Sequence, residues 1–90
     1  MTGINDIITY SMSDVAILQT LSEQIKLMRL NKNITQTELS KKSGVSRSAI
    51  SEMENGKPGT IQNLIQVLRA LEKLELLNIF AVEHAISPLQ

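Results

Sequence analysis

Ninety residues are enough for one compact domain but too few for two. The chain has no cysteine, which excludes disulfides, thiolate zinc sites and cysteine nucleophiles and is typical of a reducing cytoplasm. No apolar run approaches the roughly 18 residues of a membrane span, and the N-terminus lacks the basic start and apolar block of a signal peptide. We therefore expect a cytoplasmic protein without a membrane partner.

The formal net charge is zero, but the charges are unevenly spread along the chain. Segment 26–57 carries seven basic and three acidic residues, a net charge of +4, and the rest of the chain balances it at −4. A basic middle segment is typical of a nucleic-acid footprint. The alternative is a solvated surface whose charges are uneven by chance.

The first 13 residues show no helical period and are predicted to form an N-terminal arm. The arm either adds a short strand or docks on the domain, and a frayed terminus is the alternative. The side chains expected to form the strand or to dock are Ile4, Ile7, Ile8 and Tyr10. We assign residues 14–82 to the folded domain and residues 83–90 to a C-terminal tail.

An amphipathic helix is predicted over residues 14–31, with Ser13 as its N-cap. Its apolar residues recur at intervals of three and four and are Ile17, Leu18, Leu21, Ile25 and Met28. The Asn31-Lys32-Asn33 segment ends this helix.

A second, shorter helix is predicted to begin after Thr35 and to end at Ser43. Thr35 and Glu38 have the spacing of a capping box, in which each side chain bonds the backbone amide of the other residue. Gly44 then supplies the residue that turns left-handed without a Cβ penalty. Val45 is expected to fill the turn.

Three more helices complete the predicted fold. One begins after Ser46 and runs to about Asn55, one begins after Thr60, and the last spans Leu74 to Val82. With one Tyr, one Phe and no Trp, the core must consist of aliphatic side chains and Met, which suits packed helices. We therefore predict an all-α fold.

The pattern of segment 35–56 predicts two short, hydroxyl-capped helices joined by a tight glycine-containing turn. This arrangement is a helix-turn-helix. The second helix of such a pair can protrude, and the major groove of DNA is wide enough to admit it.

The sequence resembles the helix-turn-helix domains of the phage repressor (Cro/CI) and Xre type over about residues 21–80. The resemblance is carried by Arg29, Thr35-Gln36, Glu38-Leu39, Gly44-Val45-Ser46, Ile50-Ser51 and Glu54-Asn55-Gly56. It implies a five-helix, lambda-repressor-like bundle that forms a homodimer and binds palindromic operators in double-stranded DNA.

Two residues depart from the family pattern. Ser40 stands where Ala is common, and Ser43 stands where the family has an apolar or small residue. We expect each hydroxyl to bond a carbonyl one turn earlier and to loosen the contact between the two helices slightly.

Four residues near the start of the third helix are the candidates for base contacts, because side chains at that position reach base edges. Arg47 is the first choice, since a guanidinium pairs bidentately with guanine, and Glu52 can accept from a cytosine amine. Ser48 and Ser51 can meet a base, a phosphate or water. The alternative for each is an ordinary solvated helix surface.

Residues at the helix ends are candidates for phosphate contacts, which set register and affinity. Gln36 occupies a position that bonds a phosphate in the proteins that the chain resembles. The complete candidate set is Thr35, Gln36, Lys42, Asn55 and Lys57. The resemblance also implies a structural ion pair between Arg29 and Glu54.

The last predicted helix has more apolar surface than a short helix buries on one side, so we expect a dimer interface there. Its candidates are Leu76, Leu77, Ile79 and Phe80. The stretch 60–80 also resembles HipB-like antitoxins, which implies a toxin related to HipA-like kinases as a second partner.

No catalytic motif, metal-ligand cluster or cofactor loop stands out, so neither enzymatic activity nor a cofactor is expected. Three function classes therefore remain open. They are a transcriptional repressor, an antitoxin that represses its own operon, and an interaction module that kept the fold without binding DNA.

Overall fold

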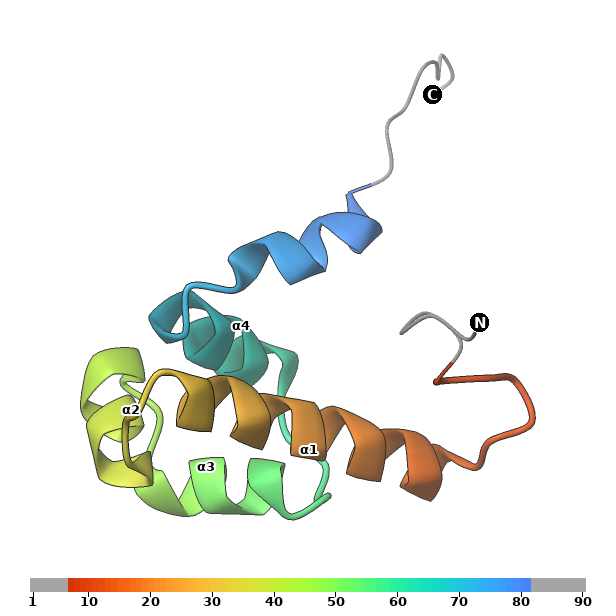
Figure 1. Cartoon of the computed structure of the whole chain (residues 1–90), viewed down its shortest axis with the longest axis horizontal. Helices are drawn as coiled ribbons and strands as arrows, with labels where there is room; N and C mark the ends of the chain where they lie inside the picture. Colours follow the sequence, from red (N-terminus) through yellow and green to blue (C-terminus); the bar gives the residue numbers. More distant parts are fainter. Residues whose placement is uncertain (1–6, 82–90) are drawn as a thin grey trace.

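The computed structural model describes residues 7–81, and within this range it contains five helices and no strand. In chain order these are α1 (Asp14–Asn31), α2 (Gln36–Ser43), α3 (Arg47–Glu54), α4 (Ile61–Ala70) and the 3-10 helix η2 (Leu74–Phe80). Figure 1 shows α1 lying between α3 on one side and α4 with η2 on the other. The all-α prediction and the number of helices are confirmed.

The four α-helices begin where the hydroxyl residues predict. The side chains of Ser13, Thr35, Ser46 and Thr60 each accept a hydrogen bond from the backbone amide three residues ahead, at 3.0–3.1 Å. Each cap satisfies one of the amides that a helix start leaves without an intrahelical partner. Local sequence therefore sets the α-helix starts before any packing is considered.

The core lies where α2, α3 and α4 meet beneath α1. Its completely buried side chains come from the three shorter α-helices and the residue after α4, and are Leu39, Ile50, Val67 and Leu71. Ile25 of α1 and Val45 of the turn complete the cluster. The predicted stripe of α1 is only partly buried, because Leu21 faces outward and is 46% exposed.

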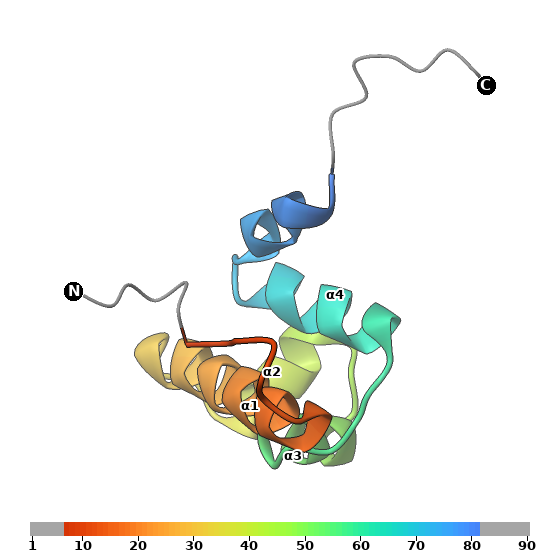
Figure 2. The same cartoon turned by 90° about the vertical axis from the view of Figure 1, so that its right-hand side faces the viewer.

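The last helix differs from the prediction. Residues 74–80 form a 3-10 helix instead of an α-helix to Val82, and none of them is buried. Glu72, with a φ of 61°, turns the chain sharply between α4 and η2. Figure 2 shows η2 at the end of the molecule opposite α3.

The described part of the arm, residues 7–13, forms a turn rather than the proposed strand, with the Met12 amide donating to the Thr9 carbonyl at 3.1 Å. Ile7, Ile8 and Tyr10 are exposed. Ile4 and the tail 83–90 lie outside the described residues. No helix within residues 7–81 has the length and apolarity to cross a membrane.

Candidate nucleic-acid interface

α3 is the element that the sequence assigns to the major groove, and its two faces differ sharply. Ile50 and Met53 point into the core with 0% and 6% of their surface exposed. Arg47, Ser48 and Glu52 are exposed on the opposite side, and Ser51 is half-buried. The helix therefore holds its inner face rigidly and presents three of its four candidate base contacts to solvent.

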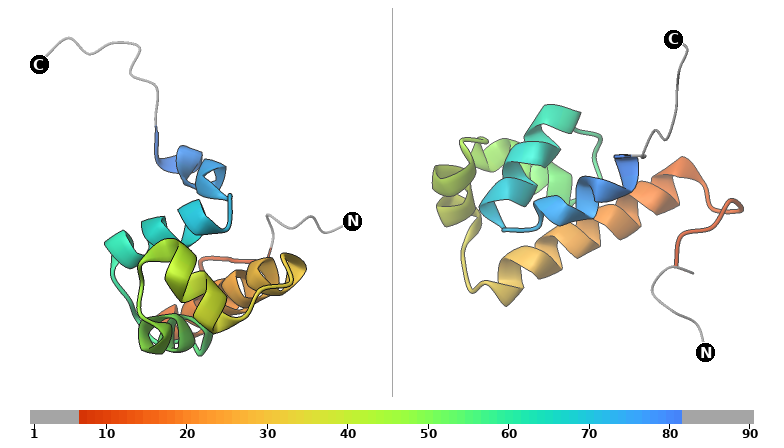
Figure 3. Two further views of the ribbon diagram at one scale, coloured as in Figure 1. Left: turned by 90° about the vertical axis from the view of Figure 1, so that its left-hand side faces the viewer. Right: turned by 90° about the horizontal axis from the view of Figure 1, so that it is seen from above.

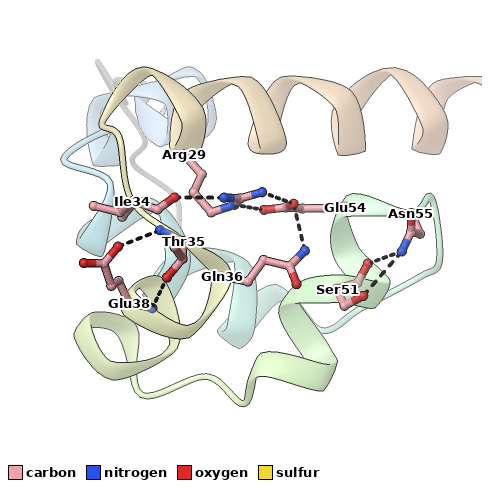
Figure 4. Close-up of polar contacts among 8 residues, drawn as sticks. All are labelled: Arg29, Ile34, Thr35, Gln36, Glu38, Ser51, Glu54 and Asn55. Carbon is pink, nitrogen blue, oxygen red and sulfur yellow. Dashed lines mark hydrogen bonds and ion pairs between the residues drawn. The ribbon is translucent and has the colours of Figure 1, made fainter.

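A buried ion pair anchors the C-terminal end of α3. The Arg29 guanidinium of α1 donates to both carboxylate oxygens of Glu54, Nε at 2.7 Å and Nη2 at 3.0 Å (Figure 4). Nη1 of the same guanidinium donates to the Ile34 carbonyl at 2.8 Å. Arg29 thus ties α3 to α1 and to the segment that enters α2.

Gln36 joins the same network. Its amide nitrogen donates to Oε1 of Glu54 at 3.1 Å, so the side chain at the start of α2 also binds the end of α3. Glu54 therefore accepts bonds from two helices and has no unsatisfied oxygen in its buried site. The sequence pattern predicts a phosphate contact for Gln36 and gives no sign of this bond to Glu54.

The network determines the ionisation of its members. Burial works to raise the pKa of Glu54, but the hydrogen bonds from Arg29 and Gln36, together with the positive charges of Arg29 and Lys26, lower this pKa below its usual value. The hydrogen bond to Glu54 raises the pKa of Arg29. Both groups are therefore charged at neutral pH, and the pair is fully ionic.

Two serines secure the turn between α2 and α3. The Ser40 hydroxyl donates to the Val45 carbonyl at 2.6 Å, and the Ser43 hydroxyl accepts from the Val45 amide at 3.1 Å. The expectation that both would bond a carbonyl one turn earlier is wrong. The two hydroxyls hold both backbone groups of Val45, because the turn brings this residue over the end of α2, and they tighten the turn instead of loosening it.

The candidate phosphate contacts flank this unit. Thr35 forms the predicted capping box, since its amide donates to Oε1 of Glu38 at 2.8 Å and its hydroxyl accepts the Glu38 amide. These bonds lower the pKa of Glu38. Lys42, at the other end of α2, is exposed.

Asn55 and Lys57 follow α3 and are both exposed. The Asn55 side-chain amide donates to the Ser51 carbonyl at 2.8 Å and lies 3.4 Å from its hydroxyl (Figure 4). This contact closes α3 and orients the side chain. Gly56, with a φ of 84°, lets the chain turn away before Lys57.

The charge on this surface is not cancelled by ion pairs within residues 7–81. The two ion pairs found there are Arg29–Glu54 and Lys32–Glu72. Four exposed cations on or beside the helix-turn-helix have no ion-pair partner in that range, and they are Lys41, Lys42, Arg47 and Lys57. Such cations favour a polyanion.

Comparison with known proteins supports this assignment. The helix-turn-helix family model matches residues 25–77, more than half of the chain. A search among curated proteins finds no significant match. The matched region contains the buried ion pair, both helices of the motif and the groups that flank them. The chain therefore belongs to the helix-turn-helix family of Cro/CI type and is a DNA-binding transcription regulator.

Proposed function

We propose that this protein is a transcriptional repressor that binds a palindromic operator as a homodimer. One observation carries the proposal: α3 is locked at its base by the Glu54 network while Arg47, Ser48 and Glu52 stay exposed. A helix held rigidly with polar side chains outward can read base edges without an ordering cost on binding. Such a protein acts in the cytoplasm, on the DNA of the nucleoid.

The chemistry of the side chains determines which of them we assign to bases and which to phosphates. Arg47 reads a guanine through O6 and N7, and Glu52 accepts from a cytosine amine. Ser48 and Ser51 contribute shorter contacts beside them. Phosphates are bound by a second group of residues that flank α3, namely Thr35, Gln36, Lys42, Asn55 and Lys57.

The proposed dimer uses η2. Leu76, Ile79 and Phe80 are 52%, 79% and 79% exposed, and Leu77 is half-buried. A short helix with this much apolar surface in water indicates an interaction site. A two-fold dimer presents two copies of α3 to half-sites about one DNA turn apart.

An antitoxin role is a second candidate, supported by the resemblance of residues 60–80 to HipB-like antitoxins. In that role the protein represses its own operon and binds a HipA-like kinase. Repression alone does not separate the two roles, since both bind DNA. Co-purification with a kinase-like protein encoded beside this gene supports the antitoxin, and its absence from the purified operator-bound protein favours the repressor.

Selection of binding sites from random duplex DNA tests the proposal directly. We expect a palindrome whose half-sites lie about ten base pairs apart, bound by two chains per site. Light scattering of the complex gives the stoichiometry. If no sequence is enriched, or if the enriched site is asymmetric and binds one chain, the proposal is wrong.

A further inference from the structure

An apolar groove of about 620 Å³ runs between α1, α4 and η2, and it also reaches Met53 of α3 and the loop that follows α3. Figure 3 shows how α1, α4 and η2 lie relative to one another. Its walls include Leu21 and Ile25 of α1, Leu64 of α4, and Leu77 and Phe80 of η2. An open groove of this size would leave several large aliphatic side chains in contact with water.

η2, which forms one wall of the groove, is itself poorly buried. Five of its seven residues are apolar, yet none of the seven is buried, and Ile79 has 79% of its surface exposed. Runs of 3-10 helix longer than three or four residues are uncommon, because their hydrogen bonds are poorly aligned. The helix therefore lacks the tertiary contacts that would normally hold a segment of this composition.

We propose that η2 of a second copy inserts into this groove, and that the groove of the second copy receives η2 in return. This inference rests on the proposed dimer and names the surface that forms it. One chain carries both the apolar helix and the apolar groove, so a two-fold axis satisfies both at once. Each inserted η2 then lies between α1 and η2 of the receiving copy.

Charge supports a second copy as the occupant. Among its lining residues the groove has two charged side chains, Lys57 and Lys73, and both are basic. Lys57 is assigned above to a DNA phosphate, so Lys73 is the cation left for a second copy. η2 has one charged side chain, Glu75, which is exposed. Insertion therefore brings an acidic group to a basic rim, and reciprocal insertion brings the second to the other rim.

Cross-linking tests this arrangement, since the natural chain has no cysteine. Leu21→Cys and Asn78→Cys chains are prepared separately, mixed and oxidised under mild conditions. Both positions are exposed, so the substitutions leave the core intact, and Asn78 is a polar residue of η2 whose replacement keeps the apolar side chains of this helix. The matched control replaces Leu21→Cys by Val15→Cys, which is on α1, 75% exposed and outside the groove.

We expect the Leu21→Cys and Asn78→Cys pair to form its mixed disulfide about a hundredfold faster than the control pair at micromolar concentration, because insertion holds the thiols at millimolar effective concentration. Ile61→Cys with Asn78→Cys repeats the test from the α4 side, where Ile61 also lines the groove and is 77% exposed.

Three results would overturn the inference, and they differ in whether they also exclude the proposed dimer. Equal rates for the groove and control pairs, in a protein that sedimentation shows to be dimeric, exclude insertion but keep the dimer. An internal disulfide in a monomeric chain carrying both substitutions shows that η2 closes on its own groove. A wild-type protein that stays monomeric at all concentrations excludes both the insertion and the proposed dimer.

Discussion

Glu54 is the residue on which the orientation of α3 most depends. Its carboxylate joins α1, through Arg29, to the start of α2, through Gln36, and it does so from the end of α3. Because the pair is buried, removal of one partner leaves the other charge unpaired in a site closed to water. Such a change strongly lowers the free energy of unfolding.

Arg29→Ala tests this cost. We expect the free energy of unfolding to fall by about 3–5 kcal/mol, because the Glu54 charge loses its partner. Urea denaturation followed by helical circular dichroism measures the change. Lys32→Ala is the control: it removes the exposed pair with Glu72, and we expect a much smaller loss of stability because solvent screens that pair. Similar losses for the two variants would contradict the structural role of the buried pair.

The pKa of Glu54 makes stability depend on pH. Since its pKa is lowered in the folded state, the unfolded chain binds the proton more readily at acid pH. This contribution is therefore present above the usual carboxyl pKa of about 4.3 and is lost as the pH falls through the lower, folded value. We expect Glu54→Gln, although less stable at neutral pH, to show a shallower loss of stability below pH of about 4 than wild type. Parallel stability–pH curves for the two proteins would contradict the assignment.

Sequence reasoning succeeded at the level of residues where the interaction is local. The capping box of Thr35 and Glu38 and the hydroxyl caps follow from spacings of three residues, and the structure confirms them. The Gln36–Glu54 bond spans 18 positions, so no local pattern reveals it. Only the crossing of α2 and α3 brings the two side chains together.

Among the elements, the turn between α2 and α3 sets the crossing of the two motif helices. Gly44 ends α2 with a φ of 78°, and Ser40 and Ser43 fix the next residue, Val45, whose side chain is 2% exposed. A left-handed residue, two side-chain bonds and one buried valine thus define how far α3 protrudes.

Gly44→Ala isolates the backbone part of this turn. A Cβ at Gly44 meets no atom within 4 Å, so the cost is conformational alone, and we expect about 1–2 kcal/mol of destabilisation. Gly44→Asn should lose less, because Asn adopts the left-handed region more readily. Gly59→Ala is the matched control, because its Cβ would make only ordinary contact with Met53 at 3.8 Å. A lower melting temperature for Gly59→Ala than for Gly44→Ala would contradict this account.

The helix that sequence reasoning described least well is η2. Its apolar residues predict a helix that extends to Val82, but the structure has a shorter 3-10 helix with no buried residue. Hydrophobic spacing reports that a segment needs an apolar partner and does not say whether that partner belongs to the same chain. The positive φ at Glu72 also has no sequence signal, because Gly is the usual residue there.

For the whole molecule, we propose different tasks for the two ends of the domain. α3 lies at one end, and η2 with its exposed apolar side chains lies at the other (Figure 2). The zero net charge hides this division, since the basic excess of segment 26–57 is balanced elsewhere in the chain. This separation supports the proposed assignment of α3 to DNA and of η2 to a second copy.

Phe80→Asn tests the separation. The side chain is 79% exposed, so we expect the melting temperature of the monomer to be unchanged while dimer formation and operator affinity both fall. Analytical ultracentrifugation and DNA titration measure the two losses. Val15→Asn, equally exposed on α1, should change neither. Loss of dimer with full operator affinity would separate dimerisation from DNA binding and contradict the proposal.

The central claim is that α3 reads the operator through Arg47, and a salt titration of two variants on the selected site tests it most directly. Arg47→Ala should lose about 1–3 kcal/mol on the selected operator and relax selectivity at one base pair in each half-site. Lys42→Ala should weaken binding to matched and mismatched duplexes alike and reduce the salt slope by about one for each chain bound. If Arg47→Ala instead weakens all duplexes equally, or changes nothing, α3 does not read the operator as described.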